Sequence, residues 1–254
     1  MGLASETVYE NRMKLAVVIP ILNELENLPA LIDSIEQLGN STIGISIIVC
    51  DDGSNDGSRI WLESEQQKGR LIVLGDGNNY GPGVAFENGF QYVLRYLSNF
   101  DFLLTMEGDG TADLSSFPIM FDSINHADVV LASVYLQGGG FSKTNWARLL
   151  ISKIANELTR ICLNLPYQTL TSFYRIYRVS TLHQLQKESN PIFSEKGFIC
   201  QVEILYKLHR KGFVIKEIPT TLFTDRRKGK SKMKLGKTMN AHVRFLWRTI
   251  KDAN

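Results

Sequence analysis

The chain of 254 residues has few cysteines and no long apolar run. Cys50, Cys162 and Cys200 are far apart and form no Cys-x-x-Cys pair, which argues against a disulfide framework or a structural zinc site and fits a reducing, cytoplasmic setting. No stretch approaches the roughly 20 apolar residues that span a bilayer. The charged N-terminal dozen residues do not resemble a signal peptide. We therefore expect any membrane contact to be peripheral.

A surplus of charge of either sign is also missing. The chain has 28 lysines and arginines against 26 aspartates and glutamates, so its overall charge offers no argument for binding nucleic acid. Basic residues concentrate between 226 and 237, and acidic clusters lie in the first half. The four histidines belong to no motif.

Two common nucleotide-binding motifs are absent. No Walker lysine follows the glycine-rich segment at Gly81 and Gly83, and no Gly-x-Gly-x-x-Gly follows the first apolar run. These absences count against a P-loop NTPase and a dinucleotide-binding Rossmann domain.

Alternating apolar runs and helical patterns dominate the first half. Strands are predicted at 15–19, 45–49, 71–74, 102–106 and 129–132, with helices at 28–38, 58–65 and 84–97. The second half predicts a helix over 145–163, an irregular stretch to 177, a helix over 197–210, a strand at 214–218 and a helical tail from 234. This alternation predicts an α/β fold with a mostly parallel central sheet.

Polar residues follow the first two predicted strands. Pro20 leads into Asn23 and Glu24, and the second strand ends in Asp51 and Asp52. Carboxylates at the carboxyl ends of parallel strands are suited to accept hydrogen bonds from a base or from ribose hydroxyls. The alternative interpretation is that these are turn and helix-capping residues.

The next polar elements follow the third and fourth strands. Gly81 and Gly83 open a helix whose N-terminus favours phosphate, although loops use glycine for other reasons. Glu107 and Asp109 are two residues apart, so in an extended segment they point the same way and suit Mg²⁺ or Mn²⁺. In isolation such a pair is more often a solvated turn, but the convergence of several polar strand ends favours a site.

The ordered set of motifs resembles the family 2 glycosyltransferases, and within them the dolichol- or polyprenol-phosphate mannose synthase-like group. The resemblance runs from about 15 to 237. Further along the chain it rests on Ser133 and Tyr135, Arg148 and Ser152, Leu170-Thr171-Ser172 with Arg175, Gln201 and Glu203, Asp225-Arg226, Gly229 and Ser231-Lys232.

The resemblance implies one GT-A domain over 1–254, Rossmann-like, with a nucleotide-sugar half at about 14–133 and an acceptor half with C-terminal helical elements at about 134–254. It implies an inverting, metal-dependent hexose transfer from GDP-mannose or UDP-glucose to a polyprenyl or dolichyl phosphate. The expected cofactor is Mg²⁺ or Mn²⁺. The expected location is the cytoplasmic face of a membrane, with room for a separate anchoring subunit.

The resemblance also implies residue roles. The residues expected to bind the nucleotide are Pro20, Asn23, Glu24, Asp51, Asp52, Gly81, Gly83 and Glu107. Glu107 and Asp109 are expected to bind the metal. The residues expected to bind the acceptor are Tyr135, Arg148, Ser152 and Arg175. The catalytic set is Asp109, Arg148, Arg226 and Lys232, with the last two closing over the diphosphate.

Three positions depart from the family pattern. Glu107 replaces an aspartate, Val134 replaces an arginine, and Phe173 replaces a glycine. Two alternatives therefore stay open: transfer to a glycan or other soluble hydroxyl, with Asp113 or Glu203 as base, or a non-catalytic nucleotide-sugar-binding subunit. A phosphate acceptor would need no strong base, because its second pKa is about 6.

The apolar helix predicted from residue 146 also permits two interpretations. Its leucines and isoleucines are interrupted by Arg148, Lys153 and Arg160. This pattern fits a helix at a lipid interface, and it equally fits a core helix with one wet face.

Overall fold

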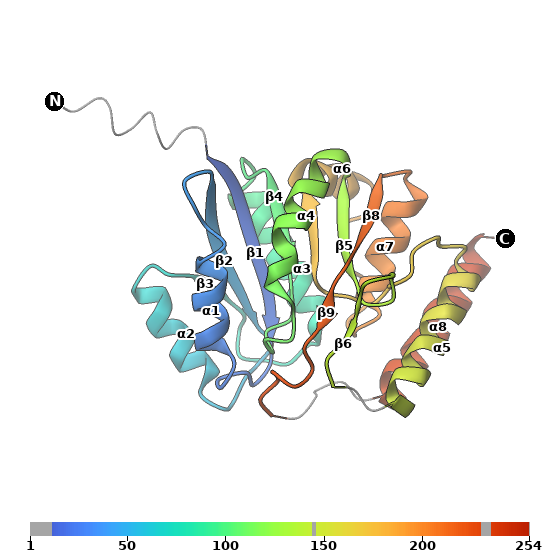
Figure 1. The fold of residues 1–254 in the computed structure, drawn as a ribbon, viewed down its shortest axis with the longest axis horizontal. Coiled ribbons are helices and arrows are strands. Elements are labelled where there is room, and N and C mark those ends of the chain that lie inside the picture. Colours follow the sequence, from blue (N-terminus) through green and yellow to red (C-terminus); the bar gives the residue numbers. More distant parts are fainter. Residues whose placement is uncertain (1–11, 144–145, 230–234, 254) are drawn as a thin grey trace.

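The structure is a computed structural model that describes residues 12–143, 146–229 and 235–253. The main strands are β1 (Met13–Ile21), β2 (Ile43–Asp51), β3 (Ile72–Leu74), β4 (Phe102–Thr105), β5 (Val129–Ser133), β7 (Arg175–Arg178) and β8 (Ile215–Pro219). They form one sheet in the order β3-β2-β1-β4-β7-β5-β8 (Figure 1). Neighbours are parallel except at β7, which runs antiparallel to β4 and β5. The short strands β6 (Gly140–Phe141) and β9 (Thr221–Leu222) pair separately.

Helices cover both faces of this sheet (Figure 1). They are α1 (Leu28–Glu36), α2 (Ser58–Gln67), α3 (Pro82–Tyr96), α4 (Phe117–Ser123), α5 (Trp146–Cys162), α6 (Val179–Glu188), α7 (Cys200–Arg210) and α8 (Leu235–Ala253), with 3-10 turns η1 (Leu114–Ser116) and η2 (Ile124–His126). Side chains of α1, α2 and α4 pack in one apolar cluster, and those of α3, α6 and α7 in the other.

Strand β1 lies inside the sheet because its apolar run has no polar face. Ala16 and Val18 pack with Phe90 of α3, whereas Val17 and Ile19 pack in the cluster that contains α1. A continuous apolar run of this kind is typical of a parallel strand covered on both sides. The observed β1 therefore extends beyond the predicted 15–19 at both ends.

The strands and helices predicted in the first half are present within a few residues of their predicted ends. Several described elements were not predicted: the helices α4 and α6, the strand β7, and the short elements β6, β9, η1 and η2. Strand β7 falls in the stretch expected to be irregular. Because β1, β2 and β4 are parallel neighbours, their carboxyl ends meet at one edge of the sheet, the lower edge in Figure 1.

Candidate active site

The loops after β1 and β2 are joined by hydrogen bonds. Asn23 N donates to Ser54 Oγ over 2.8 Å, and Glu24 N donates to Ser58 Oγ over 3.0 Å. Asn23 has a φ of 55°, in the left-handed region that asparagine tolerates better than most residues. Asn23 and Glu24 therefore lie beside the loop that carries the β2 aspartates, as predicted for residues at one edge. Ser54 and Ser58 join this loop to the one after β1, whereas the N-cap of α2 is Gly57 with no side-chain cap, so the expected capping by Ser54 is not seen.

Asp52 organises the loop that leads into α3. Its Oδ1 accepts hydrogen bonds from Tyr80 N at 2.7 Å and from Gly81 N at 3.0 Å. Burial raises the pKa of Asp52, and these two backbone N–H groups oppose that rise because they stabilise the carboxylate. Asp52 thus connects the end of β2 to the start of α3.

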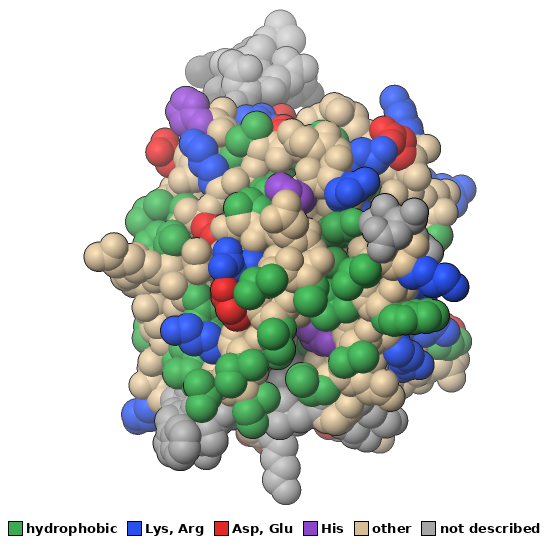
Figure 2. Space-filling view, turned by 90° about the vertical axis from the view of Figure 1, so that its right-hand side faces the viewer, with side chains coloured by type: hydrophobic (Ala, Val, Ile, Leu, Met, Phe, Trp, Pro, Cys, Tyr) green, Lys and Arg blue, Asp and Glu red, His purple; other side chains and the backbone are tan. Residues whose placement is uncertain are grey.

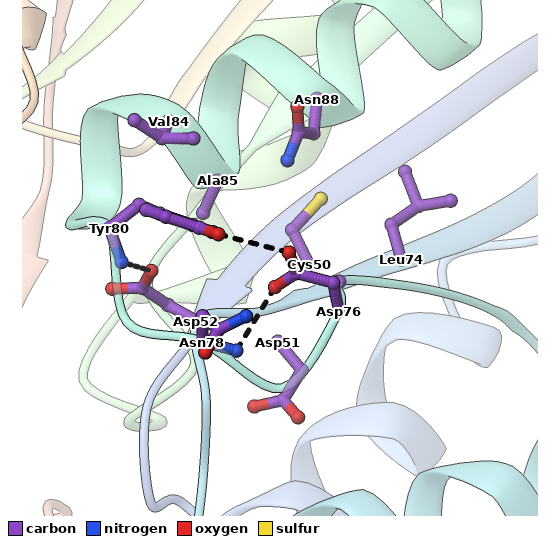
Figure 3. Close-up of a pocket in the computed structure, with 11 residues that line it drawn as sticks. Cys50, Asp51, Asp52, Leu74, Asp76, Asn78, Tyr80, Val84, Ala85 and Asn88 are labelled. Atoms are coloured by element: carbon purple, nitrogen blue, oxygen red, sulfur yellow. Dashed lines mark hydrogen bonds between the residues drawn. The ribbon is translucent and has the colours of Figure 1, made fainter.

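A cavity of about 400 Å³ opens beside Asp52, between β2, β3 and α3 (Figure 3). Its lining includes Cys50 of β2, Asn88 of α3 and Tyr80 of the loop that precedes α3. Asp51 also lines it: one carboxylate oxygen accepts from Ser54 N, and the other is buried and makes no hydrogen bond within the described ranges. This volume is within the range of small-molecule sites.

Glu107 and Asp109 follow β4 at the same edge. Asp109 Oδ1 accepts hydrogen bonds from Thr111 N at 3.1 Å and from Thr111 Oγ1 at 2.6 Å. Burial raises the pKa of Glu107 most, followed by the negative charge of Asp109 and, less strongly, that of Glu24. The positive charge of Arg227 opposes this rise, and the pKa of Glu107 is about 8. Acidic side chains from the ends of β1 and β4 therefore interact across the edge.

These carboxylates suit a hard divalent cation. Burial and the neighbouring charges of Asp109 and Glu24 both disfavour the charged form of Glu107, and a bound divalent cation would offset these effects. Among the residues that the structure describes, no three His, Cys, Asp or Glu side chains are grouped to hold a metal by themselves. A cation held by Glu107 and Asp109 would thus need further oxygen ligands, for which phosphate is well suited.

A cationic side chain that the sequence interpretation missed lies on Asp109. Arg227 Nε donates to Asp109 Oδ2 over 2.6 Å, and Arg227 Nη2 pairs with the same oxygen. The neighbouring Arg226, chosen from the sequence, instead stacks over the ring of Phe223, with 3.7 Å between the guanidinium carbon and the ring centroid. Lys232, the other predicted catalytic cation, lies outside the described residues. Two adjacent arginines give no sequence signal that would separate their roles.

On the acceptor side, two predicted residues come together. Tyr135 OH donates to Ser152 Oγ over 3.2 Å, joining the loop after β5 to α5. Arg148 belongs to the first turn of α5, where the described side chains begin at Leu149.

Arg175 does not lie where the prediction needs it. Its side chain has no exposed surface, and its two terminal nitrogens donate to the carbonyls of Gln201 and Leu170 at 2.9 and 2.7 Å. A side chain enclosed in this way binds the chain's own backbone and cannot reach an acceptor. The assignment of Arg175 to the acceptor is therefore corrected to a structural role.

The glycine-rich segment has a packing role in addition to the predicted one. A Cβ on Gly81 would lie 2.4 Å from the carbonyl oxygen of Lys196, and one on Gly83 would lie 1.8 Å from that of Glu195. Gly83 N also donates to the Lys196 carbonyl over 2.9 Å. The close approach that requires these glycines is thus to the protein's own backbone, and not only to a ligand as the sequence interpretation had it.

The two carboxylates considered as bases have structural partners. Asp113 Oδ1 accepts from Ser115 N and Oγ at the start of η1. Glu203 accepts from Ser194 N and Glu195 N and pairs with Lys207, which fixes the backbone that packs on Gly83. Both carboxylates are therefore used in holding the local backbone.

Comparison with known proteins gives consistent matches. The model of glycosyl transferase family 2 matches residues 16–186. A polyprenol monophosphomannose synthase of Mycolicibacterium smegmatis is 30% identical over 220 residues, which cover 85% of this chain and 80% of that protein. An undecaprenyl-phosphate mannosyltransferase of Micrococcus luteus is 30% identical over 227 residues, 88% of this chain and 89% of that protein.

Solved structures of more distant proteins have the same fold. A crystal structure of glucosyl-3-phosphoglycerate synthase from Mycobacterium tuberculosis with phosphoglyceric acid superposes with a TM-score of 0.65 and 17% identity, over 95% of this chain and 81% of that one. A second crystal structure of that enzyme, with Mn²⁺, uridine diphosphate and phosphoglyceric acid, gives a TM-score of 0.65 and 16% identity over 92% of this chain and 77% of that one.

Proposed function

The chain belongs to glycosyl transferase family 2 and has a GT-A fold, and from this premise we propose that it is an inverting enzyme that moves mannose or glucose from a GDP- or UDP-sugar to a polyprenyl or dolichyl phosphate. The observation that carries the proposal is the meeting of Glu24, Asp52 and Asp109, from three separate loops, at one edge of the sheet. Two relatives at 30% identity, each named for a polyprenyl-type phosphate, support the acceptor class.

The nucleoside of the donor is expected in the cavity beside Asp52. Asp51 Oδ2, which makes no hydrogen bond with the residues that the structure describes and lies 3.9 Å from Arg59 Nη1, offers an acceptor for base N–H or ribose hydroxyl groups. Glu24 and Asn23 carry further oxygens on the adjoining loop. Pro20 is buried next to the last residue of β1, and its carbonyl oxygen would lie 3.4 Å from a Cβ on Gly108, so the end of β1 packs closely on the segment that carries the β4 carboxylates.

Glu107 and Asp109 would hold Mg²⁺ or Mn²⁺, which would neutralise charge on the diphosphate leaving group. The protein's own contribution is to hold donor and acceptor anions in line and to screen their repulsion with arginine and lysine side chains. An ionised phosphate acceptor needs no proton removed, which agrees with the structural partners of Asp113 and Glu203. Tyr135 and Ser152, already in contact, would bind the acceptor phosphate with Arg148 on the same helix.

The exposed apolar side chains of α5 and α8 support the proposal that the acceptor is a lipid phosphate. Five large apolar residues on α5 and four on α8 are between 41% and 67% exposed: Leu150, Ile151, Ile154, Leu158, Ile161, Met239, Val243, Trp247 and Ile250. The two helices pack side by side, and Figure 2 shows hydrophobic side chains gathered on this side of the molecule with lysine and arginine among them. We call these nine residues the helix-pair face.

The helix-pair face fits the surface of an anionic membrane. Lys153, Arg160, Arg244, Arg248 and Lys251 lie on the same two helices. Apolar side chains with cations beside them are the combination that binds in the headgroup region of anionic lipid. Within the described ranges, no helix combines the length and the apolar character needed to cross a bilayer. We therefore propose peripheral attachment, on the cytoplasmic side of the membrane.

The test is a transfer assay with radiolabelled GDP-mannose and UDP-glucose, each supplied with polyprenyl phosphate and Mg²⁺ or Mn²⁺. The proposal expects label in the organic phase with one of the two donors, and none when Asp109 is replaced by alanine. Label found only in a water-soluble product would show that the acceptor is a soluble hydroxyl group and not a polyprenyl phosphate. Nucleotide binding without any product would contradict the enzymatic proposal.

A further inference from the structure

Because of the contact between Arg227 and Asp109, both carboxylate oxygens of Asp109 have a partner within the protein. Thr111 N and Oγ1 both donate to Oδ1, and Arg227 occupies Oδ2 through two of its nitrogens. The two paired side chains are only 23% and 10% exposed, so water screens the pair poorly. A cation that binds Asp109 through Oδ2 must therefore displace the guanidinium, because two N–H groups of Arg227 already occupy the two lone-pair sites of that oxygen.

The backbone on both sides of Arg227 is anchored independently of this ion pair. Before it, Phe223 N donates to Thr111 O over 2.9 Å. After it, the Asn27 side chain makes two hydrogen bonds with the backbone of Lys228, at 3.1 and 3.2 Å. Loss of the ion pair would thus free the Arg227 side chain while residue 227 stays at the edge of the site.

We propose that Arg227 exchanges partners during donor binding: it competes with the divalent cation for Asp109 and, once displaced, pairs with the diphosphate of the donor. A guanidinium forms charge-assisted pairs with carboxylate and phosphate alike, and its planar fork matches both groups. This inference rests on the proposed function, since it requires a metal and a nucleoside diphosphate at the same site. It also gives Arg227 a role that the sequence had suggested for Arg226, whose guanidinium stacks on Phe223.

Two consequences follow for binding in solution. Metal alone binds weakly, because it must break the Arg227–Asp109 pair without compensation. Metal and nucleoside diphosphate together bind cooperatively, because the released guanidinium gains the diphosphate as its partner. By thermodynamic linkage, each ligand then raises the affinity for the other by the same factor.

The experiment is a titration of the free Mn²⁺ signal by electron paramagnetic resonance, with and without GDP or UDP, on the purified full chain. Arg227→Gln is expected to bind Mn²⁺ alone about 10-fold more tightly than the wild type, as removal of a close competing charge pair implies. The same variant should lose most of the cooperativity between Mn²⁺ and the nucleotide. Lys228→Gln is the matched control, since it removes one positive charge from the next residue and keeps the backbone bonds to Asn27.

The outcomes separate this inference from the proposed function. If the wild type binds Mn²⁺ with nucleotide, and Asp109→Asn abolishes that binding, but Arg227→Gln and Lys228→Gln behave alike, the exchange is overturned and the metal site stands. If no variant binds Mn²⁺ with either nucleotide, both are overturned. Arg227→Lys, which keeps the charge but not the fork, provides a second folded variant; it should raise the affinity for Mn²⁺ alone less than glutamine does.

Discussion

Asp52 is the residue on which the nucleoside side of the site depends. Replacing it with alanine leaves the N–H groups of Tyr80 and Gly81 without their acceptor, so we expect a loss of about 2–3 kcal/mol in the free energy of unfolding. Asp52→Asn keeps one oxygen and should cost less, about 1 kcal/mol. Urea denaturation measures both changes.

The control for this prediction is Asp76→Ala on the same cavity. Asp76 is exposed, and it accepts from Asn78 N and Tyr80 OH at the surface. Its replacement should cost about 1 kcal/mol or less. Equal losses for Asp52→Ala and Asp76→Ala would mean that Asp52 does not organise the loop into α3.

At the residue scale, the sequence predicted which acidic side chains gather and was less reliable for arginines. Glu24, Glu107 and Asp109 interact as expected because the positions of strand ends follow from the apolar pattern. Arg175 looked like a ligand-binding residue, but its role depends on which carbonyls surround it, and no local pattern encodes that. Arg226 and Arg227 are the same residue type, and only the backbone conformation directs the side chain of Arg227 to Asp109.

Helix α3 starts where two backbones touch, and this contact should be sensitive to a single methyl group. Gly83→Ala places a Cβ against the carbonyl of Glu195, so we expect a loss of about 3 kcal/mol, with a shift of the 194–196 backbone. Gly236→Ala is the matched control in the first turn of α8, because its Cβ would meet nothing within 4 Å. That change should be neutral or stabilise the fold by up to about 1 kcal/mol. Comparable losses in thermal unfolding would rule out the contact as the cause.

Helix α8 carries a buried histidine that should make stability depend on pH. Burial lowers the pKa of His242, although its hydrogen bond to the carbonyl of Thr238 opposes this. The unfolded chain therefore takes up a proton more readily, so stability is retained above the ordinary pKa of about 6.5 and declines as the pH falls below it.

The measurement for His242 is the thermal midpoint between pH 5 and pH 8. His242→Gln should flatten the decline below pH 6.5, whereas His126→Gln, at an exposed position in η2, should leave it unchanged. If the thermal midpoint of His242→Gln declines with falling pH as much as that of the wild type, His242 does not cause the pH dependence.

At the element scale, segments with a clear apolar pattern were predicted well, including the short strands β3 and β4, whereas β7, α4 and α6 were missed. Strand β7 has only four residues and contains the buried Arg175, so its apolar pattern is broken by a charge that the tertiary structure satisfies. Helix α4 has seven residues, which give too few turns for a period to show. The segment between β4 and α4 nevertheless carries the predicted carboxylates Glu107 and Asp109.

The whole molecule presents the helix-pair face on the side opposite α2 (Figure 1). Trp247→Glu and Leu158→Glu each place a charge on this face, and we expect each to weaken binding to vesicles containing anionic lipid by about 5-fold or more. Ile60→Glu is the control, since Ile60 is 76% exposed on α2. Vesicle co-sedimentation at low and moderate salt measures the difference.

If Ile60→Glu weakens vesicle binding as much as Trp247→Glu, the helix-pair face is not the membrane contact. If Trp247→Glu instead converts a dimer to a monomer, with vesicle binding unchanged, a second copy of the chain covers the face.

The central claim is that carboxylates from separate strand ends bind a nucleoside diphosphate and a divalent cation together. Its most direct measurement is thermal unfolding with a panel of nucleoside diphosphates, with and without Mn²⁺, for wild type, Glu107→Ala and Asp109→Ala. At 100 times the dissociation constant, binding adds about 2.7 kcal/mol, roughly 5–10 °C for a chain of this size. We expect one nucleotide to give a larger shift with Mn²⁺ in the wild type, and both variants to lose the Mn²⁺-dependent part. A full Mn²⁺-dependent shift in Asp109→Ala, or no such shift with any nucleotide in the wild type, would contradict the account.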